Sequence, residues 1–164
     1  MLFKTKEFYI DKAKEEDFHD IIDIYNSNKN FLLIHMDKEN ITKSWLTNEF
    51  KQMENVGFYS CKIVDIDSNK IIGLMDFKIE EETYLSLMMI HGNLKNKGMG
   101  KKVFQSFEEY VLSKESKKIK IDVVINYSKD VLTFWRNNGF VKVKEVELNW
   151  TGKVLPAITM MKIL

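Results

Sequence analysis

Residues 83–107 read TYLSLMMIHGNLKNKGMGKKVFQSF and contain no Asp or Glu, although 24 of the 164 residues of the chain are acidic. Thr83–Ile90 is a nearly continuous apolar run, which is typical of a central strand covered on both faces. Gly98–Leu112 carries its apolar residues at helical spacing, and Ile119–Ile125 alternates apolar and polar residues as a strand does. The three segments predict a strand–helix–strand unit with parallel strands and a right-handed crossover.

Four lysines and two glycines surround the start of the predicted helix, namely Lys95, Lys97, Gly98, Gly100, Lys101 and Lys102. Cations at a helix N-terminus oppose its dipole, and local rules of this kind tend to fail at functional sites. A bound anion resolves the conflict, because N–H groups of the first turn are free and glycine lets a phosphate approach closely. The alternative is a solvated lysine-rich loop. The spacing excludes a Walker A motif, and the three-glycine dinucleotide pattern is absent.

The rest of the chain extends this unit on both sides. Strands are expected at 8–13, 58–65, 70–78, 141–150 and 157–164, and helices at 18–28, 42–53 and 128–138. Lys29–Asn40 is expected to be irregular, and a slip in the alternation of Val141–Trp150 predicts a bulge. Ser128 and Gly139 are suited to cap the two ends of the last helix. The fold class is α/β (α+β), a mixed, mostly antiparallel sheet of about seven strands with about four helices on its faces.

Composition and charge limit the classes of function. The chain has 45% hydrophobic and 30% charged residues, which is ordinary for one globular domain, 1–164. Its net charge of +1 creates no field that favours nucleic acid or an anionic membrane. The single cysteine, Cys61, excludes an internal disulfide and fits a reducing compartment. Met1–Ile10 has no apolar segment of signal-peptide length and no run of about 20 apolar residues occurs, so we expect a soluble, cytoplasmic protein.

Two motifs resemble those of the GNAT acetyltransferase superfamily. The family's phosphate loop reads Gln/Arg-x-x-Gly-x-Gly/Ala, and Lys95–Gly100 reads KNKGMG, with Lys95 as a mild departure. Phe134–Phe140, FWRNNGF, resembles the Phe-Tyr-x-x-x-Gly-Phe run at the end of the family's fourth helix. The segment from Thr83 to Phe140 is a little over a third of the chain, and the order of elements agrees with the fold. The resemblance implies the GNAT acyl-CoA N-acyltransferase fold.

The resemblance also implies acetyl-CoA as co-substrate. Backbone amides of the loop hold the pyrophosphate in this family, and the pantetheine arm lies where two central strands splay apart. These features correspond to a cofactor-binding set of Met88, Ile90, Lys95, Asn96, Lys97, Gly98, Met99, Gly100, Lys101, Ser128 and Trp135. A backbone N–H near Met88 or Met89 would polarise the thioester carbonyl, and the Met89 N–H is the candidate donor.

The catalytic acid and base are not assigned by the motifs. The family's usual acid, a tyrosine, aligns with Trp135, and indole does not ionise usefully. Either Tyr127 donates the proton in its place or the thiolate leaves without direct protonation. No acid lies within Thr83–Ile90; Glu80–Glu82 precede this strand and suit an exposed turn, and His91 follows it as a candidate catalytic residue that otherwise only ends the strand.

The acceptor site is expected in the stretch between the first two helices, which lines it in similar proteins. His35, Asp37 and Phe31 are the candidates there, with a solvated loop as the alternative. Three scattered histidines and one cysteine give no metal-ligand spacing. The partner implied is a primary amine of a small molecule or peptide, with no nucleic acid and no membrane, and a homodimer stays open because dimers are common in the family. The rival function is a catalytically silent acyl-CoA-binding regulatory domain, for which Trp135 is the main argument.

Overall fold

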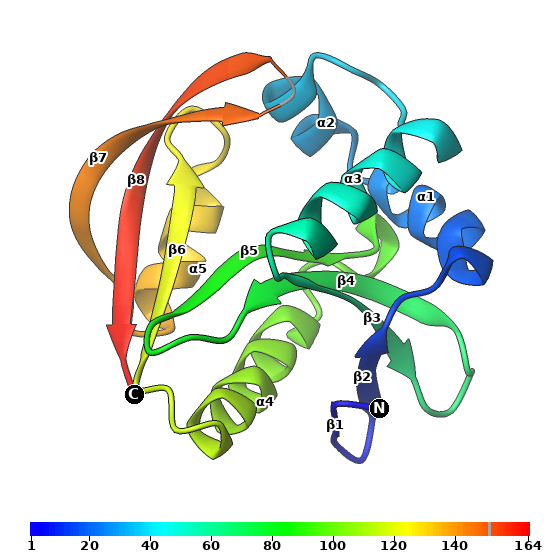
Figure 1. Ribbon diagram of the computed structural model, residues 1–164, viewed down its shortest axis with the longest axis horizontal. Helices are drawn as coiled ribbons and strands as arrows, with labels where there is room; N and C mark the ends of the chain where they lie inside the picture. The colour runs from blue at the N-terminus through cyan, green and yellow to red at the C-terminus, as the bar shows by residue number, and fades with distance from the viewer. Residues whose placement is uncertain (151) are drawn as a thin grey trace.

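The computed structural model describes residues 1–150 and 152–164. In these residues eight strands form one sheet in the order β1-β2-β3-β4-β5-β6-β8-β7 (Figure 1). The strands are β1 (Phe3–Lys4), β2 (Phe8–Lys12), β3 (Tyr59–Asp65), β4 (Ile71–Lys78), β5 (Thr83–Ile90), β6 (Lys118–Val124), β7 (Val141–Trp150) and β8 (Lys153–Ile163). The helices are α1 (Phe18–Ser27), α2 (Lys29–Met36), α3 (Lys43–Asn55), α4 (Met99–Ser113) and α5 (Lys129–Asn137), with 3-10 turns at Glu15–Asp17 and Gly92–Leu94.

The topology confirms the expected mixed, mostly antiparallel sheet. β5 and β6 are parallel, α4 connects them, and the other neighbouring strands are antiparallel. The described residues hold one strand and one helix more than expected. The extra strand is the two-residue β1, and the extra helix is α2.

The expectation that Lys29–Asn40 is irregular is therefore wrong. Residues 31–34 and 36 of α2 are apolar and lie on nearly all sides of the helix. The segment therefore shows no helical periodicity in the sequence. Tertiary packing stabilises this short helix, since its Leu32 and Met36 are buried against α1 and the sheet.

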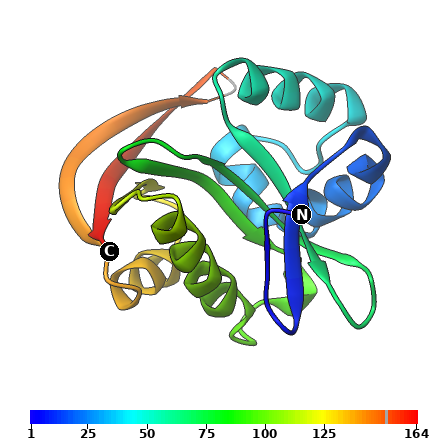
Figure 2. The same cartoon turned by 60° about the horizontal axis from the view of Figure 1, so that its bottom comes forward.

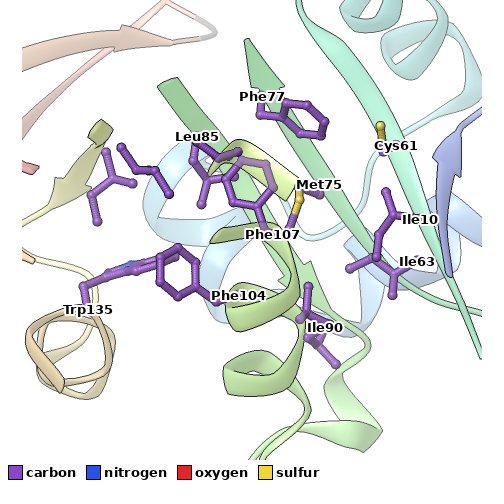
Figure 3. Close-up of a cluster of buried hydrophobic side chains, with 14 of the residues drawn as sticks. Ile10, Cys61, Ile63, Met75, Phe77, Leu85, Ile90, Phe104, Phe107 and Trp135 are labelled. Atoms are coloured by element: carbon purple, nitrogen blue, oxygen red, sulfur yellow. The ribbon is translucent and has the colours of Figure 1, made fainter. Parts of the chain in front are cut away.

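Helices cover both faces of the sheet, and Figure 2 separates the two layers, with α4 and α5 on one side and α1 to α3 on the other. The α4–α5 side contains the larger hydrophobic core. Its centre is shown in Figure 3, where Phe104 and Phe107 of α4 meet Trp135 of α5 and Phe77 of β4. Burying each of these aromatic side chains contributes roughly 1.5–3 kcal/mol. The opposite core packs α1, α2 and α3 onto Leu74 of β4 and Met89 of β5.

β5 and β6 separate soon after they begin. Their pairing in the described residues consists of Thr83 with Ile119 and Tyr84 with Lys120, and Figure 1 shows the two strands diverging beyond this point. β5 also carries a bulge, because Asp76 pairs with Leu87 and Phe77 with Leu85, which leaves Ser86 between them. Residues after Tyr84 therefore have β4 on one side and no strand on the other.

Local signals at the chain's turns behave as expected. The Ser128 hydroxyl accepts a hydrogen bond from the Asp130 N–H and caps α5, and Gly139 after the helix has a φ of 92°. The bulge expected in Val141–Trp150 is confirmed by a register shift between Lys142 and Lys144. No helix in the described residues is long and apolar enough to span a membrane.

Candidate active site

The first turn of α4 offers unpaired backbone donors. Gly98 precedes the helix with a left-handed φ of 79°, which a side chain would strain. The first helical hydrogen bond runs from the Lys102 N–H to the Gly98 carbonyl at 3.3 Å. The N–H groups of Met99, Gly100 and Lys101 have no acceptor in the described chain, as expected for a first turn. Three donors at the positive end of a helix dipole form a site for a phosphate.

The space in front of this turn is open. A Cβ added at Gly98 would have no atom within 4 Å, and one at Gly100 would lie 3.6 Å from the Phe134 ring of α5. Lys95, Asn96 and Lys97 are exposed beside it. Asn96 also adopts a positive φ, 61°, which turns the chain into the helix. Lys102 is held by Glu7 at 2.7 Å, so it is already neutralised by the protein.

β5 brings the site toward the centre of the sheet. The Met88 side chain packs on the α4–α5 side, while Leu87 and Met89 face α1 and α3. The Ile90 carbonyl accepts a hydrogen bond from the Asn28 side chain at 3.1 Å, which anchors the end of β5 to α1. The edge of β5 that faces away from β4 borders the divergence from β6, so its backbone is available to a chain-like ligand.

Trp135 belongs to the hydrophobic core. It is 8% exposed, and its ring meets Phe104 at 5.4 Å and Phe140 at 5.3 Å between centroids. The side chain fixes α5 against α4, beside the open first turn. Its neighbour in the sequence motif, Phe134, supplies the surface under Gly100.

Three of the candidates named from the sequence lie together. Phe31 and His35 of α2 stack at 4.0 Å, and the Tyr127 ring is 4.9 Å from His35 and 5.9 Å from Phe31. Trp150 completes this aromatic cluster at 5.9 Å from Phe31. The residues come from α2, from the loop before α5 and from the end of β7, segments far apart in the sequence.

Burial tunes two titratable groups in the aromatic cluster. It lowers the pKa of His35, whose Nδ1 lies 2.9 Å from the Phe31 carbonyl, so the ring is neutral at pH 7. With Nδ1–H donating to that carbonyl, Nε2 carries the lone pair. Burial raises the pKa of the Tyr127 hydroxyl, which stays protonated and can donate.

Two other candidates lie outside the cluster and have partners. Asp37 ends α2 with a φ of 52°, is exposed, and forms an ion pair with Lys153 at 2.7 Å. His91 uses both ring nitrogens: Nδ1 accepts from the Asn93 N–H at 3.1 Å, and Nε2 lies 3.0 Å from the Asp23 carboxylate. His91 therefore caps the 3-10 turn Gly92–Leu94.

Sequence reasoning missed two carboxyl groups, of which Glu49 contacts the aromatic cluster. Glu49 of α3 accepts a hydrogen bond from Trp150 Nε1 at 3.3 Å, and burial raises the pKa of Glu49. Asp76 of β4 is 8% exposed, and its pKa is raised to about 7, mainly by burial. The sequence signal that could have revealed Asp76 is its position as the single carboxyl inside the otherwise apolar run Ile71–Phe77.

Comparison with known proteins identifies this arrangement. The family model described as "Acetyltransferase (GNAT) domain" matches residues 12–164. The chain belongs to the GNAT acetyltransferase family. It is therefore an acyltransferase with acetyl-CoA as co-substrate, and the open first turn of α4 fits the diphosphate of that molecule.

Solved GNAT structures share the fold at low sequence identity. Spermidine N-acetyltransferase from Vibrio cholerae, in complex with CoA and spermine, is 14% identical with a TM-score of 0.75, over 97% of this chain and 96% of that one. A ribosomal-protein-alanine N-acetyltransferase from Brucella melitensis is 16% identical with a TM-score of 0.69, over 95% and 99% of the two chains. The PaiA N-acetyltransferase from Thermoplasma acidophilum, in complex with coenzyme A, is 17% identical with a TM-score of 0.66, over 96% and 99%. No curated protein sequence matches significantly.

Proposed function

We propose that this GNAT protein transfers the acetyl group of acetyl-CoA to a primary amine of a small molecule or a peptide. The observation that carries the proposal is the open first turn of α4 beside the divergence of β5 and β6. Together they provide an anion site and an unpaired strand edge that leads from it to the opposite face of the sheet.

The donor side uses mainly backbone groups. The N–H groups of Lys95–Lys101 would hold the diphosphate, with Lys95, Lys97 and Lys101 adding positive charge around it. The edge of β5 from Met88 to Ile90 would pair with the amide groups of the pantetheine arm. Ser128 and Trp135 act by position, since one caps α5 and the other packs this helix onto α4.

A backbone donor of β5 and the side chains of Tyr127, Phe31 and His35 would carry the chemistry. Acetyl-CoA supplies an activated thioester. The Met88 N–H, on the edge of β5 that faces away from β4, would donate to its carbonyl oxygen as negative charge develops, whereas the Met89 N–H, the candidate from the sequence, points toward Leu74 of β4. The Tyr127 hydroxyl would give its proton to the departing sulfur. Phe31 and the neutral His35 would form the wall that orients the attacking amine.

The acceptor panel follows from the structural neighbours. Those relatives are named for spermidine and for an alanine of ribosomal proteins, so the panel contains polyamines, simple alkylamines and peptides with N-terminal alanine. The assay measures free thiol released from acetyl-CoA with and without each amine, and mass spectrometry locates the added acetyl group. Amine-dependent thiol release with an acetylated amine supports the proposal. Tight binding of acetyl-CoA with no amine-dependent release across the panel would instead favour the silent regulatory domain.

A further inference from the structure

Asp76 is a buried carboxyl on the strand next to β5. It alternates with Met75 and Phe77, which belong to the core on the α4–α5 side, so its side chain faces α1 and α3 together with Leu74. The donor would reach the site from the α4–α5 side. The Asp76 carboxyl therefore lies on the face from which an acceptor would approach.

The bulge in β5 lies at Asp76. Asp76 pairs with Leu87, and Ser86 is the extra residue, so Asp76 lies one strand away from the stretch Leu87–Met89. Neighbouring strands are about 4.8 Å apart. The Asp76 carboxyl thus lies opposite Leu87, two residues before Met89, on the face where an acceptor would meet the thioester. Bulges next to active sites commonly redirect side chains in this way.

No cation among residues 1–150 and 152–164 forms an ion pair with this carboxyl. The groups that face it are Glu49 from α3, Tyr25 from α1, Ser60 from β3 and the apolar Leu87 from β5. Lys62, on β3, is bound to Asp17 at 2.7 Å. The ion pairs of the described residues include neither Asp76 nor Glu49. Burying an ionised carboxyl without a neutralising cation costs free energy. The positive charge of an incoming ammonium would offset that cost.

We propose that Asp76 is the general base of acetyl transfer and that Glu49 tunes it by like charge. The proposal rests on the proposed function. The Asp76 carboxylate takes one proton from the acceptor ammonium, directly or through one water. The freed nitrogen lone pair forms the C–N bond, and the C–S bond breaks with its electron pair on sulfur. Tyr127 gives its proton to the thiolate, and the second proton lost by the nitrogen restores the Tyr127 hydroxyl. Asp76 then loses its proton to solvent, so the net products are the acetamide, the free thiol and one proton.

Other candidate bases are less suited by position. Both nitrogens of His91 are engaged. Glu80 and Glu82 lie before the opposite end of β5 and pair with Lys78 and Lys120. His35 Nε2 is the remaining rival, and His35 lies in the aromatic cluster beside Phe31 and Tyr127.

The burial of Asp76 sets its working range. Desolvation raises the pKa of Asp76 to about 7, and the negative charge of Glu49 raises it further, while a hydrogen bond from Ser60 opposes the rise. A base with a pKa near 7 is deprotonated in part of the population at neutral pH and still accepts a proton readily. Activity should therefore rise with pH through about 7.

The test is the pH profile of kcat/KM with an alkylamine that the wild type acetylates. Asp76→Asn should lose about a hundredfold or more in kcat/KM, Asp76→Glu should recover part of it, and Glu49→Gln should move the acidic limb to lower pH. With hydroxylamine, an acceptor already neutral at the assay pH, the loss in Asp76→Asn should be smaller. A merely structural role would reduce both acceptors alike.

Control variants keep the outcomes distinct. Asp67→Asn, in the exposed β3–β4 turn, should behave as wild type. A wild-type profile in folded Asp76→Asn, equal losses with both acceptors, or disappearance of the acidic limb in His35→Asn would overturn the assignment to Asp76 and leave the proposed function intact. Absence of amine acetylation by the wild type would overturn both.

Discussion

The substitution Asp76→Asn should stabilise the protein at alkaline pH. The pKa of the Asp76 carboxyl is about 7 in the folded protein and 3.8 when the group is unperturbed. Below the lower value the carboxyl is protonated in both states. Between the two values only the unfolded chain ionises, so the free energy of unfolding falls as pH rises, and the loss is complete above about pH 7. Asparagine keeps the shape of the side chain and removes this dependence.

The size of the effect follows from the pKa difference. A rise of about three pKa units at about 1.4 kcal/mol each gives a total of about 4 kcal/mol. Roughly 2–3 kcal/mol of that falls between pH 5 and pH 8, with the rest below pH 5. Replacing a carboxyl oxygen by an amide also changes the hydrogen bond with Ser60. In the variant this bond does not titrate, and in the wild type its dependence on ionisation is already contained in the pKa of about 7.

The measurement is urea unfolding of wild type and Asp76→Asn at pH 5, 6, 7 and 8, followed by tryptophan fluorescence. Other groups titrate in both proteins, so the quantity of interest is the difference in unfolding free energy between the two at each pH. This difference should grow by about 2–3 kcal/mol in favour of the variant from pH 5 to pH 8. A constant difference would show that the carboxyl is not desolvated, and Asp67→Asn serves as the exposed control. Greater stability with lower activity is the expected signature of a functional residue.

Two further predictions concern the donor site and proton transfer. Gly98→Glu should abolish the stabilisation that acetyl-CoA gives the wild type, about 2.7 kcal/mol at a hundred times its dissociation constant, because a carboxylate would enter the proposed phosphate site. Gly152→Glu is the matched control in thermal-shift assays, since Gly152 has a φ of 78° and an equally open Cβ position; equal binding by both variants would remove the α4 turn from the site. Tyr127→Phe should lower kcat about a hundredfold with little change in unfolding temperature, because the lost hydroxyl is the proposed proton donor. Tyr9→Phe on β2 is its control, and an unchanged kcat in Tyr127→Phe would mean that sulfur leaves without this tyrosine.

The fold was predictable where short-range signals agree with the global arrangement. The apolar run Thr83–Ile90, the helix after Gly98 and the alternation of Ile119–Ile125 predicted the parallel unit correctly. The α2 helix was missed because its apolar residues surround the whole helix, and only packing against α1 and the sheet determines its conformation.

In the candidate site, too, local features were predictable from the sequence and features that depend on tertiary packing were not. The first turn of α4 was legible from the sequence, because glycines and free N–H groups at a helix start are local features that need no distant partner. Phe31, His35 and Tyr127 were named individually, but their meeting with Trp150 depends on how α2, β7 and the loop before α5 pack together. The sequence likewise did not show that both ring nitrogens of His91 have hydrogen-bond partners, since Asp23 lies on another element.

By itself, the sequence determined the order of the elements other than β1 and α2, the parallel unit and the glycine-containing start of α4, all of which depend on backbone preferences and periodicity over a few residues. Only the tertiary structure decided where β5 and β6 part, which rings form the aromatic cluster and that Asp76 is buried beside Glu49 and Tyr25. The physical reason is that desolvation and charge coupling are set by atoms from other elements. The protonation behaviour of a buried side chain can therefore be inferred only when the positions of those elements are known.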